Sequence, residues 1–289
     1  MLKEKLGLIR RYKLLYVFIA IFALISIIFG IYPMISSVCY SLFRGSSVMT
    51  TPDFVGADNY IKLLHDEYFW KSFRITVIFT VVCVPLNIIA ALVLAELLDK
   101  VRRGQLFFKL AIFIPYITPD VVGSVVWKHV FNSEGAANSL LMALGLEPIG
   151  WLTNPVTAIG VLAFVELWKH VGLYTIIIMT NYQLIDRTMY EAAMIDGADS
   201  WQEYFYITIP ALKPAISLNT AYAIIQFLKT YTVSRIITFG GPNYSTNFLS
   251  YYAYSKYERM DFGSATAIAT MLFALIVVIT VLTRRVKRR

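Results

Sequence analysis

Six long apolar stretches constrain this chain more than any other feature of its sequence. They cover residues 14–38, 75–95, 106–130, 156–182, 214–239 and 264–282. A helix needs about 20 predominantly apolar residues to cross a bilayer, so each stretch can form a transmembrane helix. The composition agrees, because 58% of the residues are apolar and only 15% are charged. The sequence therefore predicts an all-α, polytopic membrane protein with six transmembrane helices.

The segments between these stretches are too short to hold a soluble domain. We therefore predict a single transmembrane domain over residues 1–289. Four prolines lie inside the stretches: Pro33, Pro85, Pro115 and Pro119. A proline removes a backbone hydrogen bond, so these positions predict helices that kink or break where neighbouring helices satisfy the freed groups.

The distribution of Lys and Arg predicts the orientation. Basic residues precede the first stretch at positions 3–13, lie between the second and third at 100–103, and follow the last at 284–289. Cytoplasmic segments carry the excess of Lys and Arg, so both termini are expected in the cytoplasm. The net charge of +8 is then a topology signal, and we expect no nucleic-acid partner. The first stretch lacks a small-residue cleavage site and is expected to stay as an anchor.

One predicted cytoplasmic segment, residues 186–213, carries strong helix signals. Capping-box spacing occurs at Thr188 with Glu191 and again at Ser200 with Glu203. The segment is therefore expected to form two short helices.

Gly197 stands where the first helix would end in a left-handed residue, and Pro210 is expected to stop the second. Aromatic residues at helical spacing would give the second helix an apolar face: Trp201, Tyr204 and Phe205. Such a face needs a partner, either the ends of the chain's own helices or another protein. If the segment only covers its own bundle, Glu191 does no more than cap its helix.

The residues of this segment resemble a known pattern. Its core reads Glu191-Ala192-Ala193-Met194-Ile195-Asp196-Gly197-Ala198, followed by Trp201-Gln202 and Ile207-Thr208-Ile209-Pro210. This is similar to the EAA loop of the permease subunits of binding-protein-dependent ABC importers. Weaker similarities over nearly the whole chain, such as Phe54-Val55-Gly56 and Gly240-Gly241-Pro242, resemble the carbohydrate branch of maltose and sn-glycerol-3-phosphate type.

The resemblance implies a transport subunit that works by alternating access. In the family, the EAA loop docks on a separate ATPase subunit and carries its motion into the membrane helices. The residues that would contact the ATPase are Glu191, Ala192, Ala193, Asp196, Gly197, Ala198 and Trp201. No G-x-x-x-x-G-K-[ST] phosphate-binding loop occurs in the chain. We therefore expect no cofactor here, with ATP and magnesium on the partner.

The same resemblance implies the other partners and the location. They are a second homologous permease subunit, most simply in a heterodimer, an ATPase dimer, an extracytoplasmic sugar-binding protein and the lipid bilayer of a bacterial or archaeal cell (inner) membrane. One departure concerns the fifth stretch, where the family often has a Phe-Asp pair and this chain has Tyr231-Thr232. This chain therefore lacks the Asp that could contact a substrate at this position.

Ionisable and polar residues inside the apolar stretches are candidates for the substrate path, because such groups are costly in a membrane. The candidates are Asp120, Trp127, Glu166, Lys169, Tyr174, Asn219, Gln226 and Lys229. Alternatively, Glu166, Lys169 and His170 share one helix face and only neutralise one another or bridge to Asp120 and Lys229.

Two other functions stay open at this point. An intramembrane enzyme could use Glu166 and His170, although no nucleophile motif accompanies them. A self-sufficient secondary transporter would need internal repeats, and none is evident. The sequence predicts no metal site and does not identify the sugar.

Overall fold

The computed structural model describes residues 12–45, 53–101 and 103–286. The basic residues at positions 3–11 and 287–289, which helped to predict the orientation, lie outside the described residues. The described chain forms two compact units. One contains the described residues up to His65 together with Ala253–Phe273, and the other contains Asp66–Tyr252 together with the described residues from Ala274 on.

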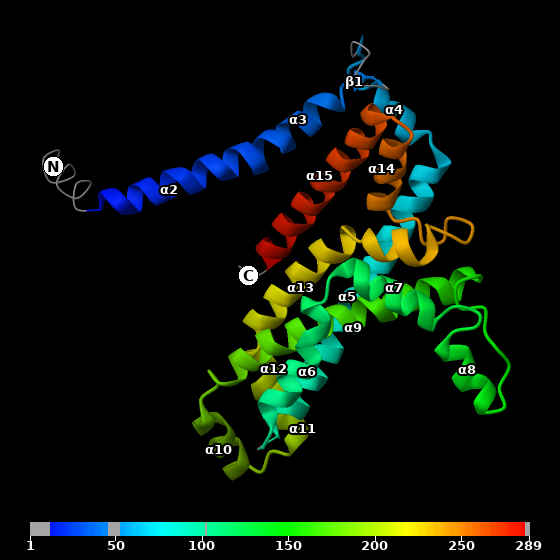
Figure 1. Ribbon diagram of the computed structural model, residues 1–289. Coiled ribbons are helices and arrows are strands. Elements are labelled where there is room, and N and C mark those ends of the chain that lie inside the picture. The colour runs from blue at the N-terminus through cyan, green and yellow to red at the C-terminus, as the bar shows by residue number, and fades with distance from the viewer. Residues whose placement is uncertain (1–11, 46–52, 102, 287–289) are drawn as a thin grey trace, which may run out of the picture. The chain divides into compact units, whose positions relative to one another are not determined.

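Helices make up nearly all of the regular structure (Figure 1). In chain order the elements are α2 (Lys13–Ser26), η1 (Ile27–Ile31), α3 (Tyr32–Tyr40), β1 (Phe43–Arg44), β2 (Asp53–Phe54), α4 (Asp58–Leu64), α5 (Glu67–Asp99), α6 (Gln105–Ile117), α7 (Asp120–Val130), α8 (Ala136–Ala143), α9 (Pro155–Tyr182), α10 (Arg187–Ile195), α11 (Ser200–Glu203), η2 (Tyr204–Thr208), α12 (Ile209–Ala211), α13 (Lys213–Leu228), η3 (Ser234–Thr238), α14 (Leu249–Glu258) and α15 (Phe262–Val286). The η elements are π-helical turns.

Within the described residues, four helices are long and apolar enough to cross a membrane. They are Leu14–Tyr40, Glu67–Asp99, Pro155–Tyr182 and Phe262–Val281. A fifth span is present if the bent pair of α6 and α7 counts as one. The prediction of a helical, polytopic membrane protein is therefore confirmed, whereas the number six is not reached by unbroken helices.

The first unit begins with one continuous helical rod, α2–η1–α3, whose side chains are mostly exposed within the unit. A two-stranded antiparallel hairpin follows, with Phe43 opposite Phe54. The buried Asn59 amide donates to the carbonyls of Ser41 (2.8 Å) and Phe43 (2.9 Å). Because Gly263 has no Cβ, the start of α15 approaches Phe43 and Asn59 closely. These contacts connect the hairpin to α4 and to the start of α15.

In the second unit, α5 packs against α9 and α13, and α6 packs against α9 (Figure 1). The buried face of α5 recurs at helical spacing and mixes apolar residues with small or polar ones: Ser72, Thr76, Thr80, Cys83, Asn87, Ala91 and Ala95. Thr76, Thr80 and Asn87 bond carbonyls four residues earlier in the helix. In lipid, the hydrophobic effect does not drive helices together, so they associate through close packing. Small residues, and polar residues that are hydrogen-bonded within their own helix, allow this close approach. The exposed face of α5 carries residues such as Ile78, Val81 and Ile89.

The third predicted stretch does not form one straight helix. α6 ends at Ile117, α7 starts at Asp120, and their axes differ by 96° (Figure 1). Thr118 and Pro119 have extended backbone. The residue before a proline is disfavoured in the helical region, which explains why the helix stops at this point. The sequence predicted a kink or break here, but not its size.

The fifth predicted stretch is also broken. α13 ends at Leu228, the chain is non-helical through Thr230 and Tyr231, and a π-helical turn covers Ser234–Thr238. No proline lies at this break, so the proline pattern did not predict it. Both breaks in the described chain fall in the second unit, on elements that pack together, α7 and η3.

Candidate functional site

A cavity of about 300 Å³ lies where the two broken helices meet the middle of α9. One wall comes from the break between α6 and α7, a second from α9, and the third from the break after α13. The lining residues are Thr118, Asp120, Gly123, Ser124, Val165, Glu166, Trp168, Lys169, His170, Gln226, Lys229, Thr230, Tyr231, Thr232 and Val233. The cavity thus brings together three segments that are widely separated in the sequence.

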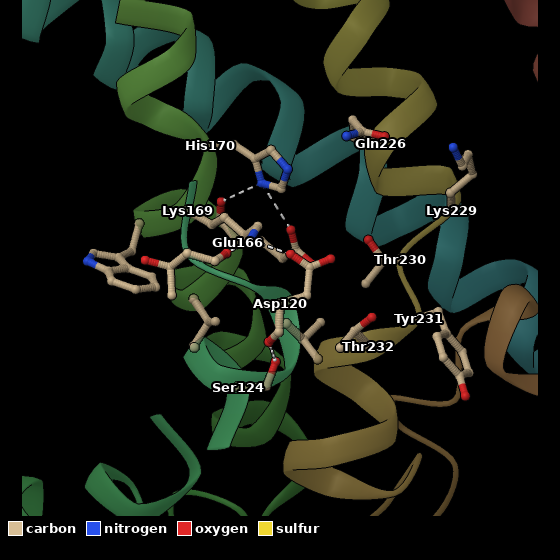
Figure 2. Close-up of a pocket in the computed structure, with 15 residues that line it drawn as sticks. Asp120, Ser124, Glu166, Lys169, His170, Gln226, Lys229, Thr230, Tyr231 and Thr232 are labelled. Atoms are coloured by element: carbon tan, nitrogen blue, oxygen red, sulfur yellow. Dashed lines mark hydrogen bonds and ion pairs between the residues drawn. The ribbon is translucent and has the colours of Figure 1, made fainter. Parts of the chain in front are cut away.

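Two pairs of acidic and basic side chains occupy one side of the cavity (Figure 2). Lys169 forms an ion pair with Asp120 at the start of α7. His170 Nδ1 lies 3.1 Å from Glu166 Oε2, and both residues are buried. Their shared helix face was predicted from their spacing, and the structure shows that this pairing does occur. Lys169 pairs across helices with Asp120 rather than with Glu166.

Lys169 also stabilises the break itself. Its ammonium donates to the backbone carbonyl of Thr118 at 2.8 Å, a group that the interrupted helix leaves without its usual partner. Non-helical backbone at membrane depth is tolerated only where other groups satisfy it. One side chain therefore holds both the exposed carbonyl of Thr118 and the first carboxylate of α7.

Replacing Lys169 with methionine should destabilise the fold by about 1–3 kcal/mol, because the carbonyl of Thr118 and the charge of Asp120 lose their partner. Thermal unfolding of the purified chain in detergent measures this loss. The double variant Asp120→Asn/Lys169→Met should recover part of the stability, because the unpaired carboxylate is removed as well. An equally stable Lys169→Met variant would show that the pair contributes nothing.

The third wall carries fewer charged groups, and fewer of its polar groups are hydrogen-bonded. Lys229 and Tyr231 point away from the acidic side of the cavity, while Thr230 and Thr232 lie between (Figure 2). The Lys229 ammonium has no hydrogen bond or ion pair within residues 12–45, 53–101 and 103–286, so it does not bridge to Asp120 or Glu166. The Thr230 hydroxyl is buried and, within the same residues, also has no hydrogen-bond partner. An unsatisfied buried hydroxyl in a cavity wall is free to bind a polar ligand.

Five of the eight candidate residues for the substrate path line this cavity: Asp120, Glu166, Lys169, Gln226 and Lys229. Three others belong to the packed interior. Trp127 stacks with Phe131 and meets Trp168 edge to face, Tyr174 is fully buried, and the Asn219 amide donates to the carbonyl of Tyr174 at 2.9 Å. A role of any of these residues in transport stays a prediction.

Reasoning from the sequence did not single out Thr118, Ser124 or Thr230 as lining residues, and it named Thr232 only as a departure from the Phe-Asp pair of the family. Threonine and serine are common inside membrane helices, where they bond their own backbone. The Ser124 hydroxyl does so, donating to the carbonyl of Asp120 at 2.7 Å. Only the break after Leu228 distinguishes Thr230 from such residues, and no sequence signal marked that break.

A second candidate site is the segment from Asp186 to Lys213. Figure 1 shows α10, α11 and α12 gathered at one end of the second unit. The carboxylate of Asp186 caps α10 by accepting from the backbone N–H of Thr188 at 3.0 Å. This bond holds the pKa of Asp186 below its usual value. The expected capping box of Thr188 with Glu191 is therefore wrong, because the helix starts two residues earlier.

The junction at Gly197 is confirmed. Gly197 has a φ of +79°, and its N–H bonds the carbonyl of Met194 at 3.2 Å. The N–H of Ala198 reaches back to the carbonyl of Ala193 at 2.9 Å. This pair of bonds is a Schellman motif, which ends α10 sharply.

The second short helix starts with a different cap from the one expected. Asp199 and Gln202 form the capping box, instead of Ser200 and Glu203. Pro210 does not stop this helix either. The chain widens into the π-helical turn η2 and continues through Pro210 in α12. Because a proline has no N–H, a change of hydrogen-bond pattern before it lets the helical path continue.

The segment presents an exposed surface, and hydrogen bonds hold its helices in place. Tyr190 and Thr208 share a hydrogen bond of 2.8 Å that connects α10 to η2. The Glu191 side chain is exposed and makes no hydrogen bond within the described part of the chain. Large apolar side chains around it are also exposed: Met194, Ile195, Trp201, Phe205 and Tyr206. The seven residues predicted to contact an ATPase are mostly exposed, with Ala193 and Ala198 half-buried.

Comparison with known proteins identifies the family. Residues 76–289 match the family model described as binding-protein-dependent transport system inner membrane component. The lactose transport system permease protein LacF of Rhizobium radiobacter is 37% identical, covering 90% of this chain and 88% of its own. The trehalose/maltose transport system permease protein MalF of Thermococcus litoralis is 30% identical, covering 96% and 95%.

A solved structure shares the fold. It belongs to a bacterial ABC transporter involved in the import of the acidic polysaccharide alginate, and it aligns over 99% of both chains with a TM-score of 0.84 and 21% identity. The resemblance stated from the sequence is thereby confirmed, and the relatives are permease proteins rather than enzymes. The chain belongs to the family of inner membrane components of binding-protein-dependent transport systems.

Proposed function

We propose that this chain is the transmembrane subunit of an ATP-driven importer for a sugar or sugar derivative. In this proposal the chain crosses the membrane six times, with both termini in the cytoplasm, and the broken helices of the third and fifth stretches count as spans. An extracytoplasmic solute-binding protein delivers the cargo, and a separate ATPase drives alternating access. The observation that carries the proposal is the exposed two-helix segment formed by α10 and α11.

The geometry of α10 and α11 suits a coupling element. The Schellman turn at Gly197, the capping box at Asp199 and the bond between Tyr190 and Thr208 fix its shape. η2 and α12 lead from it into α13, which ends at the cavity. A push on α10 would therefore reach the cavity wall through helical segments. The exposed small residues Ala192 and Gly197 leave room for another protein to approach closely.

The central cavity supports the proposal that this chain provides a path for the cargo. Transporter sites are commonly built where discontinuous membrane helices meet. Here two broken helices and α9 surround polar groups of both charges, together with the unsatisfied hydroxyl of Thr230. Sugars are bound by hydrogen-bonding side chains with an aromatic surface nearby, and Trp168 supplies that surface. We propose that the cargo passes through this cavity.

The relatives support a sugar as cargo without selecting one. Their names refer to lactose, to trehalose and maltose, and to sulfoquinovosyl glycerol. The alginate transporter was solved in complex with a periplasmic protein bound to an alginate pentasaccharide. By analogy, this chain would receive its cargo from such a protein at the cell membrane of a bacterium or archaeon.

The proposed assembly contains a second homologous permease and an ATPase dimer, with ATP and magnesium bound on the ATPase. The exposed apolar faces of α2, η1 and α3 within their unit support a further membrane-embedded partner in addition to lipid. A surface of this kind needs to be covered by apolar groups.

Reconstitution in liposomes tests the proposal. Uptake of the cognate sugar should require the ATPase, the second permease and the binding protein together, and should stop when ATP is omitted. Uptake by this chain alone, unchanged by addition of the ATPase, would disprove it in favour of a secondary transporter.

Changing Thr230 to valine should weaken transport without loss of stability. The variant keeps the shape of the side chain and removes a buried hydroxyl that has no partner in the described protein. We expect a rise of about 5- to 20-fold in the KM of uptake, equivalent to one lost hydrogen bond of about 1–2 kcal/mol, and an unchanged or higher Tm. Thr220→Val is the matched control, because its hydroxyl is already bonded to the carbonyl of Ile216. Equal KM values in both variants would remove Thr230 from the substrate path.

A further inference from the structure

Four aromatic rings form a closed circuit beside the central cavity. They belong to Tyr116 on α6, His170 and Tyr174 on α9, and Tyr222 on α13. The ring centres of Tyr116 and Tyr174 lie 6.2 Å and 6.1 Å from that of His170. The ring centre of Tyr222 lies 6.2 Å from that of Tyr174, and its hydroxyl shares a hydrogen bond of 3.2 Å with that of Tyr116. These four residues, which we call the aromatic layer, therefore connect three helices.

The aromatic layer lies at one end of the cavity. His170 and Gln226 line the cavity, and Figure 2 shows both near its upper edge. Tyr174 follows His170 by about one turn toward the end of α9, and Tyr222 precedes Gln226 by about one turn toward the start of α13. These two helix ends connect to the segment from Asp186 to Lys213, which is expected in the cytoplasm. The layer thus lies between the lining of the cavity and the cytoplasmic end of these helices.

A long hydrogen bond closes the layer between α6 and α13. Both helices pack against α9, whereas the hydroxyls of Tyr116 and Tyr222 bridge them directly. Bonds between two hydroxyls are usually about 2.7–2.8 Å long, so this bond is a weak one. The Gln226 amide donates to the Tyr222 hydroxyl at 3.0 Å and holds it in position. A weak bond between two separate helices can break and re-form when one of them shifts.

The α9 side of the layer is tightly packed, but it is not fully hydrogen-bonded. Tyr174 is completely buried, and its hydroxyl has no hydrogen-bond partner within residues 12–45, 53–101 and 103–286. A buried hydroxyl without a partner costs free energy, which is recovered when a rearrangement exposes it to water or to another polar group. The closed layer is therefore less stable than a fully bonded one, as a contact that opens in each transport cycle requires.

A movement of α13 would act directly on this hydrogen bond. η2 and α12 lead from the exposed α10 and α11 into α13, which carries Tyr222. α13 ends at Leu228, and the non-helical residues after it can absorb a change of direction. Tyr116 lies on α6, just before the break that separates α6 from α7. A shift of α13 alone would therefore separate the two hydroxyls.

We propose that the aromatic layer is the inner gate of the transport path. It closes the central cavity toward the cytoplasm while the bond between Tyr116 and Tyr222 is made, and it opens when the ATPase displaces α13. This inference rests on the proposed transport function and assigns release of the cargo to named side chains. If the four rings only fill the interior, their substitution would change the stability of the protein but not access to the cavity.

Access of a thiol reagent to the cavity from the cytoplasmic side tests the gate. Thr232→Cys places a reporter in the cavity wall, and Cys39→Ser with Cys83→Ala removes the native thiols. The complete transporter, in inverted membrane vesicles that expose the cytoplasmic face, is treated with the membrane-impermeant anion methanethiosulfonate ethylsulfonate. We expect the labelling rate to differ by about tenfold or more between the nucleotide-free complex and the complex trapped with ATP and vanadate.

Removal of the two hydroxyls should leave the gate open. Tyr116→Phe/Tyr222→Phe keeps both rings, and its slower labelling rate should rise until the two nucleotide states differ by less than about threefold. Tyr182→Phe is the matched control, because its hydroxyl also joins two helices, donating to Glu96 on α5 at 2.7 Å outside the layer. The control should keep the difference seen in the parent. Equal elution volume and Tm confirm that both variants are folded.

A reversible bridge tests the gate in the opposite direction. In Tyr116→Cys/Tyr222→Cys, with the native thiols removed, a bifunctional methanethiosulfonate long enough to replace both rings should stop ATP-driven uptake of sugar. Dithiothreitol should restore uptake, because it cleaves the bridge. The same reagent should leave uptake unchanged in each single cysteine variant, where no bridge can form.

Four outcomes would overturn the inference. They are equal labelling of the parent in both nucleotide states, a double Phe variant that keeps the difference of the parent, an equal loss in Tyr182→Phe, and uptake that continues with the bridge in place. Each of them leaves the transport function intact as long as the parent complex takes up sugar with ATP. Failure of ATP to drive any uptake by the parent would instead reject the function.

Discussion

Glu191→Lys is expected to leave the chain folded and inserted while lowering ATP-driven uptake about 100-fold, a loss of roughly 2.7 kcal/mol in coupling. Glu191 is exposed on α10 and makes no hydrogen bond within the described residues. Since Asp186 caps the helix instead, reversing the charge of Glu191 should not weaken α10. It would instead place a like charge against any basic group of the docked ATPase, and truncated or reversed charge pairs at interfaces cost about 2–5 kcal/mol.

The measurement compares sugar-stimulated ATP hydrolysis and uptake in the reconstituted complex. Glu191→Gln should give a smaller loss, because it removes the charge without reversing it. Glu147→Lys, a charge reversal in the segment between α8 and α9, should change neither rate by more than twofold. If Glu191→Lys hydrolyses ATP and transports normally, the carboxylate has no part in coupling.

Gly172→Val is expected to destabilise the protein strongly. A Cβ on Gly172 would overlap the backbone carbonyl of Ile112, where α9 packs against α6. Backbone atoms cannot rotate away as a side chain can, so the two helices would have to separate. We expect a loss of about 3 kcal/mol or more, the upper range for overpacked cores.

The same helix offers a matched control for this prediction. Gly160 also lies in α9, but a Cβ there would meet no atom within 4 Å. Gly160→Val should therefore unfold within a few degrees of the parent in detergent, and Gly172→Val far below it. Equal melting temperatures for the two variants would show that α6 can move without cost.

Local signals in the sequence predicted several features correctly. Apolar stretches of sufficient length identified the long helices α5, α9 and α15, because hydrophobic length alone determines whether a helix can span a bilayer. Gly197 predicted the junction after α10, since a left-handed residue is needed where that helix ends. Glu166 and His170 share a face because four residues make about one helical turn.

The predicted N-caps of α10 and α11 were wrong because two nearby residues can each cap the helix. Asp186 and Thr188 can both cap a helix, as can Asp199 and Ser200. The sequence favoured the later residue of each pair through its partner three positions on, whereas the structure uses the earlier one. The structure starts α10 two residues earlier than predicted and α11 one residue earlier.

The sequence by itself determined that this chain is a helical membrane protein with two short helices joined at Gly197, because hydrophobic length and turn residues act locally. Only the tertiary structure decided what lines and adjoins the central cavity. Asp120 and Lys169 pair from different helices, and Tyr116 and Tyr222 share a hydrogen bond, although each pair is far apart in sequence. These contacts depend on where two helices break and on how the segments on either side of each break pack. The periodicity of the sequence does not encode either of these.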